Sequence, residues 1–282
     1  MRLLVFGETG QVATELRRQG GSDVTALGRG KVDLSDPAAC AAAIAVSDAQ
    51  AVINAAAYTA VDRAETEEAL ATKINGAAPG AMARACADRE LPFLHVSTDY
   101  VFPGTGEAPW RPEDPVAPLN AYGRSKLAGE EEVRAAGGPH VILRTSWVFS
   151  AHGANFVKTM LRLAASHNSL SVVDDQIGGP TPAADIAEAL LVMAHTMAKG
   201  QKGGTYHFAG YPWVSWKCFA RETFARAARD VAIRGIPSLD YPTPAARPLN
   251  SRLDCAKIEQ DFGIAIPDWK SGLLAVLREL NT

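Results

Sequence analysis

Several features that mark other classes of protein are missing from this chain. No apolar run approaches the ~20 residues that cross a bilayer as a helix. The N-terminal M-R-L-L-V-F-G-E-T-G carries only a short apolar run before Gly and Glu, which suits a first strand better than a secretory signal. These absences predict a soluble protein of the cytoplasm.

Cysteine and histidine are sparse and unpatterned. The cysteines form no C-x-x-C pair, and the six histidines show no H-E-x-x-H or other zinc spacing. We therefore expect reduced thiols and no catalytic transition metal. The cysteines are Cys40, Cys86, Cys218 and Cys255.

Charge of one sign is not in excess. The chain has 28 Lys and Arg against 31 Asp and Glu, a formal net charge of −3, which gives no support for binding to nucleic acid or a membrane surface. Its 282 residues, 47% of them hydrophobic, suffice for one large domain or a domain with a smaller lobe.

A glycine turn follows the first apolar run, at residues 2–6. The segment G-E-T-G-Q-V-A lets the backbone approach a pyrophosphate, and the helix start after it presents free N–H groups. Its spacing is G-x-x-G-x-x-A, with Ala13 in the third glycine's place, so a purely structural turn is the alternative. The predicted cofactor contacts here are Gly7, Gly10, Gln11 and Val12.

The next two strand ends extend this prediction. In nucleotide-binding folds an arginine after the second strand suits a 2′-phosphate, and Arg29 follows the strand at 24–27. We therefore predict NADPH rather than NADH, with an exposed turn arginine as an equal alternative that leaves NADH open. Further predicted contacts are Asp33 and Leu34 near the adenine, and Ala57, Tyr58 and Thr59 after the strand at 51–54.

The segment at 120–130, N-A-Y-G-R-S-K-L-A-G-E, sets Tyr122 four residues before Lys126, on one face of a helix. A nearby ammonium lowers the pKa of a phenol from ~10 by ~1–3 units. Such a tyrosine can protonate a carbonyl oxygen as hydride reaches the carbon. A surface Tyr and Lys is the alternative.

Polar residues also follow the strand expected at 91–96. Open α/β sheets bind ligands beyond the carboxyl ends of their strands, so Thr98, Asp99 and Tyr100 should face a ligand. His95, inside the strand, is more consistent with core packing than with catalysis. The loop at 103–118 should lie over the site.

Alternating apolar strands and helical segments predict an α/β fold with a doubly wound, Rossmann-type parallel sheet. We expect an NADP(H)-binding domain at residues 1–146, to which segments near 171–209 return, and a smaller C-terminal substrate-binding lobe over 147–282. Helices are expected at 64–72, 77–89 and 216–232, with Asn75 as a cap.

A hydroxyl at a strand end followed by Tyr-x-x-x-Lys resembles the extended short-chain dehydrogenase/reductase superfamily. Six segments then resemble the dTDP-4-dehydrorhamnose reductase family, over nearly the whole chain to about Asp254. They are N-A-A-A-Y-T-A-V-D-R-A-E, S-T-D-Y-V-F-P-G, P-L-N-A-Y-G-R-S-K-L-A-G-E, R-T-S-W-V-F, D-Q-I-G-G-P-T and Y-P-T-P-A-A-R-P-L-N-S.

The resemblance implies reduction of the C4 ketone of dTDP-4-dehydro-β-L-rhamnose by NADPH, giving dTDP-L-rhamnose for cell-surface polysaccharide. It assigns catalysis to Thr98, Tyr122 and Lys126, with Tyr122 and Lys126 also contacting the cofactor. Arg247, in a proline-rich loop, is placed to clamp a diphosphate, with an exposed loop arginine as the alternative. The implied substrate contacts are Thr98, Asp99, Tyr100, Trp147 and Arg247.

The resemblance also implies a homodimer, in some members with Mg²⁺ at the dimer contact. Glu15 matches one such ligand, but Asp185 stands at a second position, which puts the metal in doubt. Ala13 and Gly28-Arg29 depart from the family pattern and leave cofactor choice open. A nucleotide-sugar 4-epimerase, a related dTDP-deoxysugar reductase and a non-catalytic NADP-binding regulatory subunit remain as alternatives.

Overall fold

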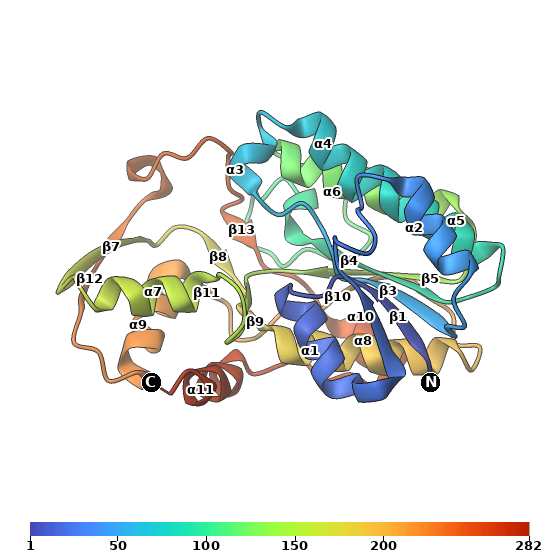
Figure 1. Cartoon of the computed structure of the whole chain (residues 1–282). Helices are drawn as coiled ribbons and strands as arrows, with labels where there is room; N and C mark the ends of the chain where they lie inside the picture. The colour runs from blue at the N-terminus through green and yellow to red at the C-terminus, as the bar shows by residue number, and fades with distance from the viewer. Residues whose placement is uncertain (282) are drawn as a thin grey trace.

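The computed structural model describes residues 1–281 and is built around a six-stranded sheet in the order β10-β5-β4-β3-β1-β2 (Figure 1). All its neighbouring strands are parallel. Later strands are added on both sides of β1, so the sheet is doubly wound, as predicted. The strands are β1 (Leu3–Phe6), β2 (Val24–Leu27), β3 (Ala51–Asn54), β4 (Phe93–Thr98), β5 (His140–Thr145) and β10 (Gly204–His207).

Helices cover both faces of this sheet (Figure 1). On β1, Leu3 and Val5 pack into one core cluster, whereas Leu4 and Phe6 pack into another. This alternation explains why the strand reads as an unbroken apolar run. One face carries α2 (Pro37–Ala45), α5 (Ala78–Ala87) and α6 (Ala121–Ala135); the other carries α1 (Gln11–Gly20), α8 (Ala183–Met197) and α10 (Ala256–Phe262).

A smaller lobe has its own two apolar clusters. In it, β7 (Ser169–Val173) pairs with β12 (Ala232–Ile236), and a three-stranded sheet joins β11 (Val214–Ser215), β8 (Ile177–Gly178) and β13 (Asn250–Ser251). Thus α8 and β10 lie with the large sheet, whereas β7 does not. Other elements include α7 (Phe156–Ala164), α9 (Trp216–Arg226), α11 (Trp269–Glu279), β6 (Val148–Phe149) and β9 (Thr181–Pro182).

Three predicted local structures are wrong. The helix expected at 216–232 ends at Arg226, because residues 232–236 form β12. The helix expected at 64–72 is two short ones, α3 (Val61–Ala64) and α4 (Glu68–Thr72). Asn75 is not a cap: it lies buried in the π-helical turn η2 (Lys73–Ala77), where its side chain binds the backbone of Tyr58.

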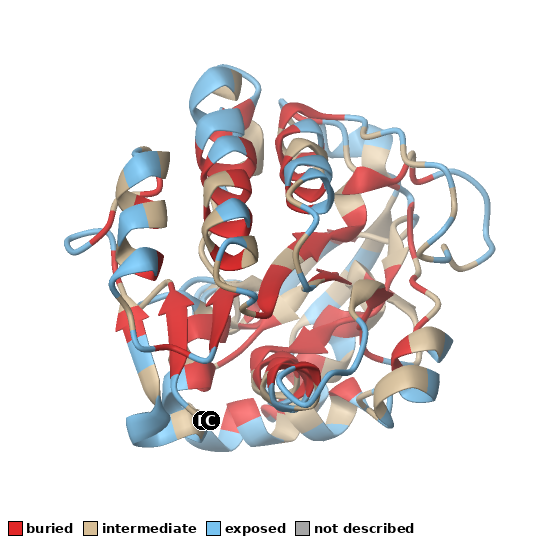
Figure 2. Ribbon diagram, turned by 90° about the vertical axis from the view of Figure 1, so that its right-hand side faces the viewer, coloured by how far each residue is buried: buried red, intermediate tan, exposed pale blue. Residues whose placement is uncertain are grey.

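Buried residues concentrate along the strands and on the inward sides of the helices (Figure 2). Within residues 1–281, none of the helices has the length and apolar character that crossing a membrane requires. The core therefore stabilises the sheet, and the loops at the strand ends can carry the residues of a site.

Candidate active site

A cleft of about 1130 Å³ opens beyond the carboxyl ends of the strands. This exceeds the ~300–1,000 Å³ of a pocket for one drug-sized ligand. Most residues predicted for cofactor or substrate line it: Gly7, Gly10, Gln11, Val12, Arg29, Asp33, Leu34, Ala57, Thr59, Thr98, Asp99, Tyr100, Tyr122, Lys126 and Trp147.

One end of the cleft is formed by the glycine turn. Gly7 has φ +115°, and a Cβ there would lie 3.2 Å from the Cβ of Ala13, so both the conformation and the close packing require glycine. Gly10 precedes α1 without a capping side chain, and the first turn holds no acidic residue. The helix N–H groups are thus free to bind an anion such as a pyrophosphate.

The loop after β2 forms the adjoining wall. Arg29 is exposed there and Asp33 is half-buried. The Ser35 backbone N–H, 2.8 Å from the carboxylate of Asp33, lowers the pKa of that carboxyl, and the charge of Arg29 acts in the same direction. Tyr58, by contrast, does not line the cleft, because its hydroxyl donates to Glu67 at 2.6 Å.

The start of α6 holds Tyr122 against the turn η3 (Asp99–Val101). Asn120 caps the helix by accepting the Gly123 N–H at 2.8 Å. A Cβ on Gly123 would lie 2.3 Å from the Tyr100 carbonyl oxygen, so glycine permits this close approach. As a result, the Tyr122 ring packs edge-on to Tyr100 at 5.5 Å between centroids.

The electrostatics of Tyr122 differ from the prediction. Burial, with the charge of Asp99, raises the pKa of Tyr122 to about 12, against the effect of a hydrogen bond with Thr98. Lys126 does line the cleft, but its Nζ donates to the Val96 carbonyl at 2.7 Å. The expected lowering of the Tyr122 pKa by Lys126 is therefore wrong for this structure.

Asp99 and Thr98 form a second polar contact in the cleft. The Thr98 hydroxyl donates to Asp99 Oδ1 at 3.1 Å and accepts the Tyr100 N–H at 3.2 Å. Burial raises the pKa of Asp99 to about 6, and the hydrogen bond from Thr98 acts against this rise. Both side chains sit where a polar substrate group would meet them.

Two stacked tryptophans form the wall contributed by the smaller lobe. Trp147 has φ +48°. The centroids of the Trp147 and Trp216 rings lie 3.5 Å apart, and the ring planes differ by 11°. A Cβ on Gly178 would come within 2.7 Å of the Trp147 indole, so that glycine makes room for the pair. Sequence reasoning missed Trp216, because its place at the start of α9 carries no motif.

Arg247 makes a different contact from the one predicted. Its guanidinium binds Asp62 through two hydrogen bonds, of 2.6 and 2.8 Å. It also donates to the Ala245 carbonyl and is not among the residues lining the cleft. Arg247 thus joins α3 to the proline-rich loop, and its role as a diphosphate clamp stays a prediction.

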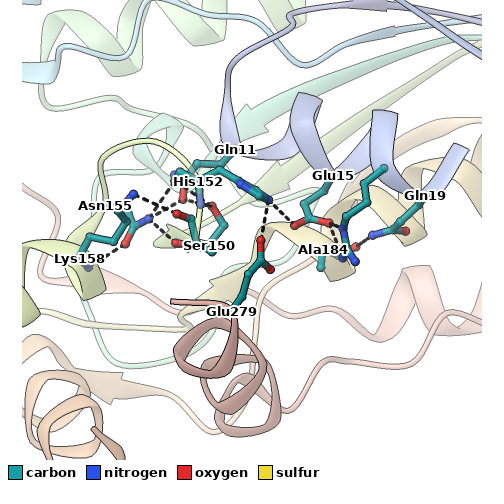
Figure 3. A network of polar contacts seen from close by, with 11 residues as sticks. Gln11, Glu15, Gln19, Ser150, His152, Asn155, Lys158, Ala184 and Glu279 are labelled. Carbon is teal, nitrogen blue, oxygen red and sulfur yellow. Dashed lines mark hydrogen bonds and ion pairs between the residues drawn. The ribbon is translucent and has the colours of Figure 1, made fainter. Parts of the chain in front are cut away.

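Gln11 links the two lobes (Figure 3). Its Oε1 accepts from the Ser150 hydroxyl at 2.9 Å and from Asn155 Nδ2 at 3.0 Å. Asn155 lines the cleft with Gly153 and was missed, since only the folded chain brings it to the first turn of α1. Gln11 is therefore held by protein partners beside the glycine turn.

The predicted magnesium ligand Glu15 also belongs to this network (Figure 3). Its two oxygens bind His152 at 3.0 Å and Arg18 at 2.6 Å, and Glu279 lies 3.6 Å from His152. Asp185 is not part of the cluster formed by Glu15, His152 and Glu279. Burial together with the charges of Glu188 and Glu15 raises the pKa of Asp185 to about 6. Because Arg18 and His152 already satisfy Glu15, this arrangement gives magnesium no support.

Comparison with known proteins identifies the family. The protein-family model described as RmlD substrate binding domain matches residues 1–282. A dTDP-4-dehydrorhamnose reductase of Sinorhizobium fredii is 43% identical, over 96% of this chain and 94% of its own. The chain belongs to the dTDP-4-dehydrorhamnose reductase family.

Solved structures of this family share the fold over the whole chain. A dTDP-4-dehydrorhamnose reductase from Clostridium acetobutylicum has a TM-score of 0.93 at 34% identity, covering 100% of both chains. The Bacillus anthracis enzyme, in complex with NADP, has a TM-score of 0.91 at 32% identity, covering 99% of both. The family and fold predicted from the sequence are thus confirmed.

Proposed function

We propose that this chain reduces the C4 ketone of dTDP-4-dehydro-β-L-rhamnose with NADPH and so makes dTDP-L-rhamnose. One observation carries the proposal beyond family membership. Thr98 and Tyr122 meet at the carboxyl end of β4, in the same cleft as the anion-binding start of α1. A proton donor and a dinucleotide site thus share one cavity.

The residues present suit NADPH. Gly7, Gly10 and the N–H groups of α1 would hold the diphosphate, and the exposed Arg29 would take the 2′-phosphate. The Bacillus anthracis relative, described in complex with NADP, supports this choice. When bound, NADPH supplies the hydride that the C4 carbon receives.

In the proposed mechanism Tyr122 donates its phenolic proton to the C4 oxygen. A pKa of about 12 makes it a weak acid, but an alkoxide is a much stronger base than the phenolate that remains. The Thr98 hydroxyl stabilises the developing negative charge on that oxygen. Asp99 holds a sugar hydroxyl, and the face of Trp147 forms the wall beside the nucleotide sugar.

The larger context stays a prediction. We propose a homodimer in the cytoplasm whose product serves polysaccharide synthesis. The large sheet domain would carry the cofactor, and the smaller lobe the sugar nucleotide. This division rests on the glycine turn lining the cleft from the large sheet domain, and on Trp147 and Trp216 lining it from the smaller lobe.

The test uses the purified chain with dTDP-4-dehydro-β-L-rhamnose and NADPH. We expect one NADPH to be oxidised per sugar reduced, and NMR of the product to show the rhamno configuration at C4. Interconversion without net NADPH loss would indicate an epimerase, and the opposite C4 configuration a related deoxysugar reductase. No turnover, with another enzyme co-purifying, would favour a regulatory subunit, and strict NADH dependence would refute the role of Arg29.

A further inference from the structure

Three buried polar side chains lie in a row beneath the active site. Asn54 ends β3, His95 lies on β4 and Lys126 on α6, and their exposed fractions are 1%, 0% and 2%. Asn54 Nδ2 lies 3.1 Å from His95 Nδ1, and His95 Nε2 lies 3.2 Å from Lys126 Nζ. His95, expected to pack in the core, is thus in direct contact with Lys126, one of the residues predicted to be catalytic.

The hydrogen-bond directions in this row follow from Asn54. Its Oδ1 accepts the Ala56 backbone N–H at 3.2 Å, so its Nδ2 is the atom that donates to His95. Burial, with the charge of Lys126, lowers the pKa of His95 well below its ordinary value, so the imidazole is neutral and carries one N–H. Because Nδ1 accepts, that N–H is on Nε2.

The Nε2–H of His95 therefore points at the Lys126 amine. An ammonium has only donors, so a charged Lys126 would face this N–H donor to donor, whereas a neutral amine accepts it with its lone pair. The other contact, to the Val96 carbonyl, is available to either form. The geometry thus favours the neutral amine.

We propose that His95 is a positioning residue: through the tautomer that Asn54 imposes, it destabilises the Lys126 ammonium and sets the pH at which Lys126 loses its proton. For turnover, this inference rests on the reductase function proposed above. Burial and Asp99 dominate the resting pKa of Tyr122, but an ammonium on the same face of α6 would favour the phenolate that forms as Tyr122 gives up its proton. We therefore expect the rate to fall as Lys126 deprotonates.

The other groups around Lys126 agree with this account. Burial lowers the pKa of Lys126 to about 8, against the attraction of Glu130 one helical turn away. Tyr122 precedes it by one turn of α6, and Asp99 acts on Tyr122 from η3. Glu130 itself is bound by Arg144, so it offsets little of the effect of burial.

Lysine Cε–Hε NMR of the full chain measures the pKa of Lys126 without substrate, with Lys126→Met to assign its resonance. In His95→Gln the amide oxygen can accept from the ammonium. In Asn54→Asp the carboxylate requires an N–H on Nδ1, which turns Nε2 into an acceptor. We expect each change to raise the Lys126 pKa by about 1–2 pH units and to move the alkaline limb of kcat with it.

His207→Gln is the matched control, because His207 is equally buried but its ring contacts the Trp110 carbonyl and Arg144 rather than Lys126. A glutamine there keeps a polar side chain beside both partners. It should leave the Lys126 titration where it is. An unchanged Lys126 pKa in both His95→Gln and the nearly isosteric Asn54→Asp would overturn the proposal. If the pKa shifts but the wild type turns over no dTDP-sugar, the proposal holds and the reductase function fails.

Discussion

Two buried polar clusters lie one helical turn apart between α6 and β4, and only one of them holds a counter-ion for its charged group. Lys126 meets His95, and Glu130 meets Ser97, whose hydroxyl donates to it at 2.6 Å. Residues two apart on a strand share a face, as do residues four apart on a helix. The two clusters therefore lie between the same helix and strand, but Lys126 lines the cleft, Glu130 does not, and their partners differ.

Glu130 keeps its charge because cations surround it. Arg144 binds both its oxygens, at 2.9 and 2.7 Å, and Arg134 adds a contact at 2.6 Å. Burial alone would raise the pKa of Glu130, but these hydrogen bonds and charges lower it overall. Among residues 1–281 no carboxylate lies within ion-pair distance of Lys126, and its pKa falls toward neutrality. A buried group with its counter-ion is structural, whereas one without becomes titratable at working pH.

The largest effect on stability is expected from Arg144→Met, which leaves Glu130 buried without its main partner. Breaking such a pair costs about 3–5 kcal/mol, measured as the free energy of unfolding in urea. Because the folded pKa of Glu130 is lowered, the contribution of the pair is present above the ordinary glutamate pKa and is lost as pH falls through the folded value. A loss below 1 kcal/mol would contradict the comparison.

Lys126→Met should have the opposite sign at pH 7. The Lys126 pKa is about 8 in the folded protein against an ordinary 10.5, so burying the ammonium destabilises the wild type by roughly 3 kcal/mol. Methionine removes this cost but also removes the hydrogen bond to the Val96 carbonyl, which stabilises the fold by about 1 kcal/mol. We expect a variant more stable than the wild type by about 2 kcal/mol, although inactive.

This gain should shrink between pH 8 and 10.5, where the unfolded wild type binds a proton that the folded protein does not, so that wild-type stability rises with pH. Urea unfolding at pH 7 and pH 9.5 measures both values. Destabilisation of the variant at pH 7 would mean that contacts in the folded wild type offset the cost of burying the Lys126 ammonium.

The smallest effect is expected from Arg84→Ala. Arg84 of α5 pairs at 2.7 Å with Glu132, which lies on α6 as Glu130 does. The side chains of Arg84 and Glu132 are 55% and 47% exposed. Solvent screens such a pair, so we expect a loss of at most ~1 kcal/mol, smaller still at high salt. A loss equal to that of Arg144→Met would show that burial is not what separates the two cases.

The sheet could be predicted because its central strands β1 and β3 are short, fully buried runs, and the ranges found for β2 and β3 are the predicted ones. The strand β12 could not, because its sequence A-I-R-G-I contains Arg and Gly and pairs only with β7. Helix-like residues before it made the prediction extend α9 too far.

Site residues could likewise be predicted only where local sequence marks them. Gly7, Thr98 and Tyr122 stand at strand or helix ends that local sequence marks, and all three line the cleft. Arg247 is held by Asp62, 185 residues away in sequence, and no local pattern shows such a partner. The spacing of Tyr122 and Lys126 predicts a shared face, but not the burial that raises the Tyr122 pKa.

The central claim, that Tyr122 delivers the proton, is tested most directly by Tyr122→Phe. NADPH oxidation in the presence of dTDP-4-dehydro-β-L-rhamnose should fall by ~10²–10⁴-fold, as for a lost general acid. Affinity for NADPH, followed by fluorescence titration, should stay at the wild-type value, because the phenyl ring keeps the packing against Tyr100. A variant that turns over at nearly the wild-type rate would contradict the account.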